Sequence, residues 1–328
     1  MKNTKISRRS FLLGLAACSA AGVLTACSGS SEPASSASTA PEPPASSAAS
    51  EVTAAPFLTV EDFPALDGST ACIPLIAQML ADTTGMDLEE AQSIISVSTT
   101  AYAWESFGLY NTDTKMLVVY EAPDSVKEEL KAANVQLEQK PIGVDALVFI
   151  VNEDNPVTDL TQQQLRDIYA GRITNWKEVG GDDATIVVLN RKAGSGTRAT
   201  FEAAVFGDEA VDFKGDAELD KSGDVQTQMG STDNAISYLD FSHFDDSKFN
   251  AIKVEGVEPK SKNVTDDSFK IWATEHMYCS KDADEATKAF LEFMLSDDVQ
   301  GKLVEEQGFI PVSAMKVVKD ASGKVSAK

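Results

Sequence analysis

The chain has 328 residues, 43% of them apolar, and a formal net charge of -23. This acidic excess repels nucleic acid backbones and anionic membrane surfaces, and neither is an expected partner. The charge becomes four units more negative without residues 1–26, which hold four basic and no acidic residues. An anion site in this chain must therefore be built from local backbone donors and a fixed cation.

The first 56 residues have the sequence of an export signal and a tether. A basic start leads into an apolar stretch at 11–24, which is shorter than the roughly 20 residues of a permanent membrane span. The pair Arg8-Arg9 leaves two export routes open, the twin-arginine route and the general secretory route. Leu24-Thr25-Ala26-Cys27 resembles a lipobox, which predicts a signal peptide over 1–26 and lipidation of Cys27.

Residues 27–56 are mostly Ser, Ala, Pro, Gly, Thr and Glu, which predicts a disordered tether. The remaining 57–328 are long enough for two lobes. Only Cys72 and Cys279 lie in that part, and a disulfide and two buried thiols both stay open. We expect no cofactor and no metal, because the chain has only two histidines, His243 and His276, and the sequence shows no cluster of metal ligands.

Short apolar runs alternate with helical patterns in this part, which indicates an α/β fold. The predicted strands are 116–120, 146–151, 186–189 and 270–278. The predicted helices are 75–80, 125–133, 161–169, 197–205, 284–295 and 298–306. We expect the polar tail from Ser313 onward to be loosely ordered.

The strongest local signal is the run Arg191-Lys192-Ala193-Gly194-Ser195-Gly196-Thr197, which lies between an apolar strand and a helical pattern. Free N–H groups and the positive end of the helix dipole face outward at such a helix start, where anions bind. The glycines let the backbone approach closely, the hydroxyls add donors, and the arginine adds a fork of donors. A plain capped turn is the alternative. Arg198 either points into the expected cleft or pairs with an acid on its own helix, and we expect the pairing.

Two more hydroxyl-rich segments precede helical stretches, 67–74 with Ser69 and Thr70, and 96–102 with Thr99 and Thr100. A tetrahedral anion has oxygens that point in four directions, so one helix start cannot surround it. A second helix start of the same kind would complete the site.

The run 191–197 resembles the Arg-x-x-Gly-Ser-Gly-Thr segment of the PstS-like phosphate-binding proteins of bacterial phosphate importers. The blocks 141–146 and 152–176 also resemble that family, and the likeness runs in order from about Asp67 to Pro311. The resemblance implies a two-lobed periplasmic-binding-protein-like fold of type II, with the ligand cleft between the lobes and two crossover strands. Lobe I would hold 57–141 and 258–318, lobe II 142–257, and a polar tail 319–328.

The resemblance also implies phosphate-binding residues. Arg191 matches the family arginine, and Ser195, Gly196 and Thr197 match its hydroxyl and backbone donors. The donor loop of the first lobe falls at 69–73, where Ala71 and Cys72 replace a frequent Thr. The donors implied in the first lobe are Ser69, Thr70, the backbone of Ala71, and, more loosely aligned, Thr99 and Thr100.

Glu121 stands where the family usually has an aspartate that accepts a proton from phosphate. An ionised carboxylate only accepts hydrogen bonds, so Glu121 would favour hydrogen phosphate over fully ionised sulfate. The alternative is a solvated glutamate at a strand end.

The expected function is capture without catalysis. A monomer, anchored through Cys27 to the outer face of the cytoplasmic membrane, would bind inorganic phosphate and present it to the permease of an ABC transporter. One alternative is a binding protein or sensor of the same fold for another oxyanion. The alternative from another class is a phosphoester hydrolase or transferase that uses Ser195, for which the sequence offers no obvious base.

Overall fold

The computed structural model describes residues 58–109, 112–122, 124–207, 209, 211–296, 299–300, 307–319 and 324–328. The export signal, Cys27 and the tether lie outside these residues, as does most of the helix predicted at 298–306. Among the described residues, no helix has both the length and the apolar character needed to cross a membrane.

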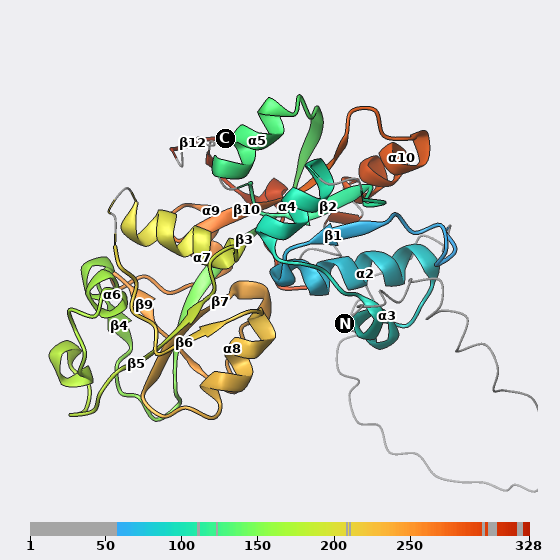
Figure 1. The fold of residues 1–328 in the computed structure, drawn as a ribbon. Helices are drawn as coiled ribbons and strands as arrows, with labels where there is room; N and C mark the ends of the chain where they lie inside the picture. The colour runs from blue at the N-terminus through green and yellow to red at the C-terminus, as the bar shows by residue number, and fades with distance from the viewer. Residues whose placement is uncertain are drawn as a thin grey trace, which may run out of the picture. The chain divides into compact units, whose positions relative to one another are not determined.

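A mixed eight-stranded sheet organises the described chain (Figure 1). Its strands follow the order β1-β2-β10-β3-β7-β5-β6, with β8 paired to β3. They are β1 (Leu66–Gly68), β2 (Met116–Val119), β3 (Leu137–Val151), β5 (Val187–Arg191), β6 (Ala217–Leu219), β7 (Ala235–Asp240), β8 (Asn250–Ala251) and β10 (Trp272–Ser280).

Strand β3 divides the sheet into two halves because it changes partner along its length. Residues 137–146 pair antiparallel with β10, and residues 147–151 pair antiparallel with β7. We call β1, β2 and β10, together with η1 and the helices that pack with them, the first half-sheet, and β7, β5 and β6, together with α7 and the helices that pack with them, the second half-sheet. The stretch 142–151 is buried throughout, so the apolar run at 146–151 reads as a continuous core strand without alternation.

Helices cover both half-sheets, and their ends follow local capping chemistry. Helix α6 begins at a capping box that Thr161 and Gln164 form, and α2 ends at Gly85 in the left-handed conformation. The α-helices are α2 (Ile73–Thr84), α3 (Leu88–Ile94), α4 (Thr100–Gly108), α5 (Asp124–Ala132), α6 (Gln162–Tyr169), α7 (Gly196–Phe201), α8 (Ser222–Met229), α9 (Ser261–Thr265) and α10 (Glu285–Met294). Shorter elements include 3-10 turns η1 (Thr70–Cys72), η2 (Trp176–Val179), η4 (Phe241–His243) and η5 (Val312–Ala314), and the π-helix η3 (Glu202–Phe206), which continues α7.

Each half-sheet has its own apolar core. In the second, aromatic rings pack among aliphatic side chains, and Phe201 stacks on Tyr238 with ring centroids 4.6 Å apart. In the first, α2 packs on β2 and α10 through residues such as Met79. Cys72 and Cys279 lie in that first core as two buried free thiols, which decides the question left open between thiols and a disulfide.

Part of the expected lobe I packs with the second half-sheet. Phe269, Ile271 and Ile310 all belong to its core, although they fall within 258–318. The lobe limits 57–141 with 258–318, and 142–257, stay a prediction.

The prediction of a loosely ordered tail from Ser313 is wrong for its described part. Strand β11 (Val317–Lys319) pairs antiparallel with β12 (Val325–Ala327), and valines of both strands pack against the second core. Lys319 also holds the tail in place, because its Nζ donates to the carbonyl of Trp272 over 2.7 Å and lies 3.9 Å from the centre of that ring.

We expect Gly68→Ala to destabilise the first half-sheet. A Cβ at Gly68 would lie 2.3 Å from the backbone oxygen of Val118, so β1 and β2 would have to move apart. Such overpacking lowers the free energy of unfolding by about 1–3 kcal/mol, measurable by chemical denaturation.

The matched control is Gly230→Ala, where φ is -68° and the nearest atom to the added Cβ lies 3.5 Å away. That change should alter stability by less than about 0.5 kcal/mol. Equal losses in both variants would contradict the close-approach argument.

Candidate functional site

Arg191 at the end of β5 is the centre of the site. Its side chain is buried, with 1% of the residue exposed, and a buried guanidinium is stable only when its charge and donors are matched. Each of its five N–H groups has an acceptor in the structure. The acceptors are Thr197 Oγ1 (3.3 Å), Ser222 Oγ (3.1 Å), Thr70 Oγ1 (3.3 Å) and the carbonyls of Asp220 (3.1 Å) and Leu219 (3.4 Å).

The turn between β5 and α7 depends on two glycines. Gly194 has φ +88°, in the left-handed region that favours glycine. A Cβ at Gly196 would lie 2.3 Å from Cδ2 of Tyr120 and 2.4 Å from Oγ1 of Thr100. Glycine at 196 therefore lets two side chains of the first half-sheet reach the start of α7.

Asp240, at the end of β7, supplies the charge that matches Arg191. Its carboxylate is fully buried, and Oδ2 accepts from Thr197 Oγ1 over 3.1 Å and from Ser222 Oγ over 3.0 Å. Each hydroxyl thus accepts from the guanidinium and donates to the carboxylate, so the two charges are joined through hydroxyl bridges. The other oxygen, Oδ1, accepts from the phenol of Tyr120 over 2.8 Å.

The first half-sheet reaches the site through η1 and the start of α4. Thr70 accepts from Arg191, and the amide of Ala101 donates to the carbonyl of Gly194 over 3.2 Å. Thr100 is 2% exposed, and its Oγ1 has no hydrogen-bond partner among the described residues. A buried hydroxyl without a partner is destabilising, and an oxygen of a bound ligand would remove that penalty.

The structure brings together Arg191, Thr197, Gly196, Thr70 and Thr100 from the predicted set. Two predicted hydroxyls are used locally as helix caps: Ser69 Oγ accepts from the amide of Ala71 over 3.2 Å, and Ser195 Oγ accepts from the amide of Arg198 over 3.3 Å. Thr99 is the N-cap residue of α4 and makes no side-chain cap bond. The loops are therefore as expected, while part of the donor set is engaged in holding them.

Glu121 is not brought to Arg191. Its side chain is 38% exposed, and its carboxylate pairs with Lys127 Nζ over 3.1 Å. Successive side chains of an extended chain point to opposite sides, and here Tyr120 points toward Asp240. The carboxylate at the site comes from Asp240 of the second half-sheet.

The predicted pairing of Arg198 is confirmed, because its Nε donates to Glu202 over 2.7 Å. Sequence reasoning missed Ser222, Asp240 and Tyr120. Ser222-Gly223 opens α8 directly after β6, the same hydroxyl and glycine pattern that marked Ser195-Gly196. Asp240 ends the otherwise uncharged strand β7, and that interruption was the available signal.

Two more buried carboxyl groups lie near Asp240. Burial, with Asp240 as the next cause, raises the pKa of Asp145 well above its usual range. Burial and then Asp145 likewise raise the pKa of Glu275, which is fully buried and interacts with Cys72 and Tyr120. Burial favours the protonated acid at both positions, which limits the negative charge around Arg191.

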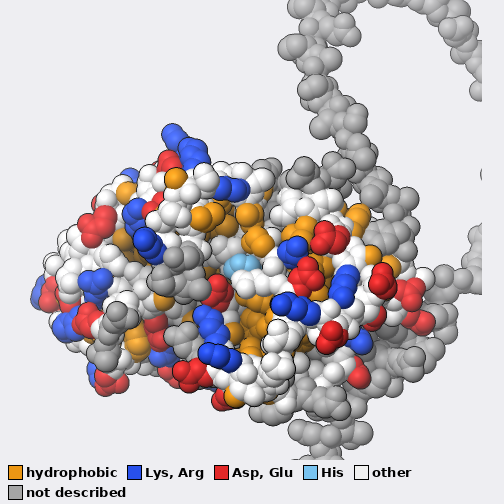
Figure 2. Space-filling model, turned by 90° about the horizontal axis from the view of Figure 1, so that it is seen from above, with side chains coloured by type: hydrophobic (Ala, Val, Ile, Leu, Met, Phe, Trp, Pro, Cys, Tyr) orange, Lys and Arg blue, Asp and Glu red, His pale blue; other side chains and the backbone are white. Residues whose placement is uncertain are grey.

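The net charge of -23 gives the protein no overall attraction for anions. On the face drawn in Figure 2, acidic and basic side chains are interspersed around apolar patches.

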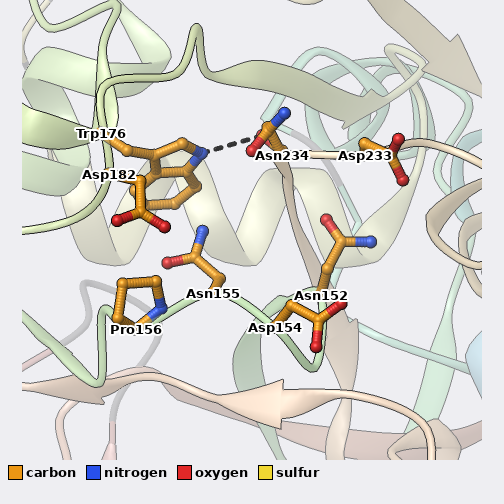
Figure 3. A pocket seen from close by; sticks show the side chains of 8 residues that line it. All are labelled: Asn152, Asp154, Asn155, Pro156, Trp176, Asp182, Asp233 and Asn234. Atoms are coloured by element: carbon orange, nitrogen blue, oxygen red, sulfur yellow. Dashed lines mark hydrogen bonds between the residues drawn. The ribbon is translucent and has the colours of Figure 1, made fainter.

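A separate pocket of about 340 Å³ has eight lining residues (Figure 3): Asn152, Asp154, Asn155, Pro156, Trp176, Asp182, Asp233 and Asn234. Its three aspartates repel anions, and it includes none of the predicted site residues.

The chain belongs to the PBP superfamily, whose domain model matches residues 109–298. It is 41% identical over 185 residues to the phosphate-binding protein PstS of Bacillus subtilis. That alignment covers 56% of this chain and 61% of the relative, so the match spans less than two thirds of that protein.

Two solved structures share the fold. One is a putative phosphate ABC transporter substrate-binding protein with bound phosphate from Clostridium perfringens. It superposes with a TM-score of 0.64 and is 31% identical in sequence, and the alignment covers 76% of this chain and 99% of that chain. The other is an ABC-type phosphate transport receptor from Vibrio cholerae, with TM-score 0.57 and 27% identity over 75% of this chain and 98% of that chain. The two-lobed fold expected from the sequence is confirmed.

We expect Glu275→Gln to flatten the pH dependence of stability. A carboxyl whose pKa is raised in the folded state contributes stability fully below its ordinary value of 4.5, and that contribution is lost as pH rises. Gln keeps the shape and removes the titration. The free energy of unfolding should therefore fall less between pH 5 and pH 8 in the variant than in the natural chain.

The control is Glu129→Gln, at an exposed position on α5, which should leave the wild-type pH profile unchanged. Urea denaturation at several pH values measures both. An unchanged slope in Glu275→Gln would mean that Glu275 is already ionised in the folded protein.

Proposed function

We propose that this chain captures inorganic phosphate and delivers it to the permease of an ABC transporter, without catalysis. The observation that carries the proposal is the buried guanidinium of Arg191, to which hydroxyls converge from both half-sheets. Relatives named as phosphate-binding proteins support phosphate as the anion. A tetrahedral oxyanion has the charge and the acceptor directions that this donor set matches.

Binding would exchange internal partners for ligand oxygens. The hydrogen bonds from Arg191 to Thr70 and to Thr197 are both 3.3 Å long, at the weak end of the normal range. An anionic oxygen would form shorter, charge-assisted bonds with the same donors. The free hydroxyl of Thr100 adds a donor from the first half-sheet, and backbone N–H groups at the start of α7 add others.

The donors on both half-sheets favour a hinged mode of capture. Thr70 and Thr100 come from the first half-sheet, and Arg191 and Thr197 from the second. Closing the two lobes over the anion would complete the donor set and exclude water, and β3 and β10 would bend as the crossover strands.

The proposal extends to the parts of the chain outside the described residues. Lipidation of Cys27 would anchor the protein to the outer face of the cytoplasmic membrane, and 27–56 would tether a monomer within reach of its permease. The predicted lipobox and tether support this arrangement.

A phosphoester hydrolase using Ser195 is disfavoured by the local contacts. The Ser195 hydroxyl accepts the amide hydrogen of Arg198, and no histidine is among its hydrogen-bond partners in the described chain. A nucleophilic serine needs a base within hydrogen-bond reach.

We expect Arg191→Lys to weaken phosphate binding by about 10- to 100-fold. Lysine keeps the charge that Asp240 needs but loses the planar fork, and each hydrogen bond to a charged group contributes about 1.5–3 kcal/mol. Calorimetric titration of the exported domain with phosphate, sulfate and molybdate measures the change.

The matched control is Arg172→Lys at a position where 47% of the side chain is exposed, which should bind phosphate like the natural chain. A phosphoester assay runs alongside. Unchanged affinity in Arg191→Lys would reject this site, and turnover of the ester would reject capture without catalysis.

A further inference from the structure

Tyr120 reaches the site from the first half-sheet, where its phenol donates to Asp240. It follows β2 directly, is 4% exposed, and its own carbonyl is held by the indole N–H of Trp104 over 3.1 Å. Its ring lies against Gly196, where a Cβ would come within 2.3 Å of ring atom Cδ2. The ring therefore covers the start of α7, where an anion would meet the backbone donors.

The phenol of Tyr120 occupies one of the two carboxylate oxygens of Asp240. It donates to Asp240 Oδ1 over 2.8 Å, while Oδ2 holds the hydroxyls of Thr197 and Ser222. Burial and the neighbouring Asp240 raise the pKa of Tyr120 well above 10, so the phenol stays protonated and remains a donor at neutral pH. Asp240 thus has a donor on each of its two oxygens.

The network in the structure is closed, because every guanidinium N–H of Arg191 and both oxygens of Asp240 have partners. An anion that contacts Arg191 must break at least one of these bonds. A hydroxyl carried by hydrogen phosphate would donate to the same kind of acceptor as the Tyr120 phenol, so the two would compete for Asp240 Oδ1.

We propose that Tyr120 is an affinity-determining residue of this site, an internal competitor whose bond to Asp240 must break before a protonated oxyanion can take the same acceptor. The inference rests on the proposed function. It assigns to Tyr120 and Asp240 the part of the site that the sequence had given to Glu121. The bond between Tyr120 and Asp240 and the bound state exclude each other, so weakening the first strengthens the second.

The test is phosphate titration of four forms of the exported domain: the natural chain, Tyr120→Phe, Asp240→Asn and the double variant. Phenylalanine keeps the ring and removes only the donor. We expect Tyr120→Phe to bind phosphate about 10-fold more tightly, because the competing charge-assisted bond is gone. In the Asp240→Asn background the same change should alter affinity less than about twofold, since the charged acceptor is already absent.

The matched control is Tyr102→Phe, on α4 with 53% of the residue exposed, which should leave affinity unchanged. Thermal unfolding verifies that each variant is folded. A folded Tyr120→Phe that binds phosphate as the natural chain does, or more weakly, overturns the inference while leaving the proposed function intact.

The remaining outcomes separate the two proposals. If phosphate binding is detectable for Tyr120→Phe but not for the natural chain, the result supports the inference, with a hydrogen bond from Tyr120 that competes strongly enough to prevent binding. If neither form binds phosphate, the proposed function fails and this inference fails with it. If Tyr120→Phe changes phosphate affinity by the same factor in the natural chain and in the Asp240→Asn background, the hydrogen bond to Asp240 is not the competitor. That result would overturn the inference.

Discussion

The site depends on one constraint, that a guanidinium taken out of water must have its charge and all its donors matched. Arg191 meets this constraint through hydroxyls that pass its hydrogen bonds on to Asp240. The strand ends, the glycine turn and the helix starts place those hydroxyls. Such a site keeps the positive charge of Arg191 buried and in place. A local cation of this kind can bind an anion in a chain whose net charge is strongly negative.

Much of the fold was predictable because local chemistry and tertiary structure agree. The strand at 116–120 and the helix at 161–169 come within one residue of β2 and α6, since apolar runs and a capping box define them. The full length of β3 could not be predicted from the sequence. Its first residues, 137–141, are half-exposed or exposed, and their extended form depends on pairing with β10. Pairing with a distant strand leaves no local pattern to read.

The site divides in the same way. Arg191, Gly196 and Thr197 could be predicted from the sequence because they are neighbours with a recognisable spacing, and their role as anion donors stays a prediction. Asp240 and Ser222 come from other elements, and only the order of strands in the sheet brings them to Arg191. The structure places the Glu121 side chain beside Lys127 and away from Arg191, because successive side chains of an extended segment point to opposite sides.

Strand β3 has a mechanical consequence. It forms a ladder with β10 over residues 137–146 and another with β7 over residues 147–151, so a relative rotation of the half-sheets would be absorbed as twist along the paired strands β3 and β10. The irregularity between Glu275 and His276 is the point where that ladder already changes register. Such a motion would be a distributed twist of paired strands rather than a rotation about one hinge residue. The stiffness of these strands would then set how readily the two half-sheets come together.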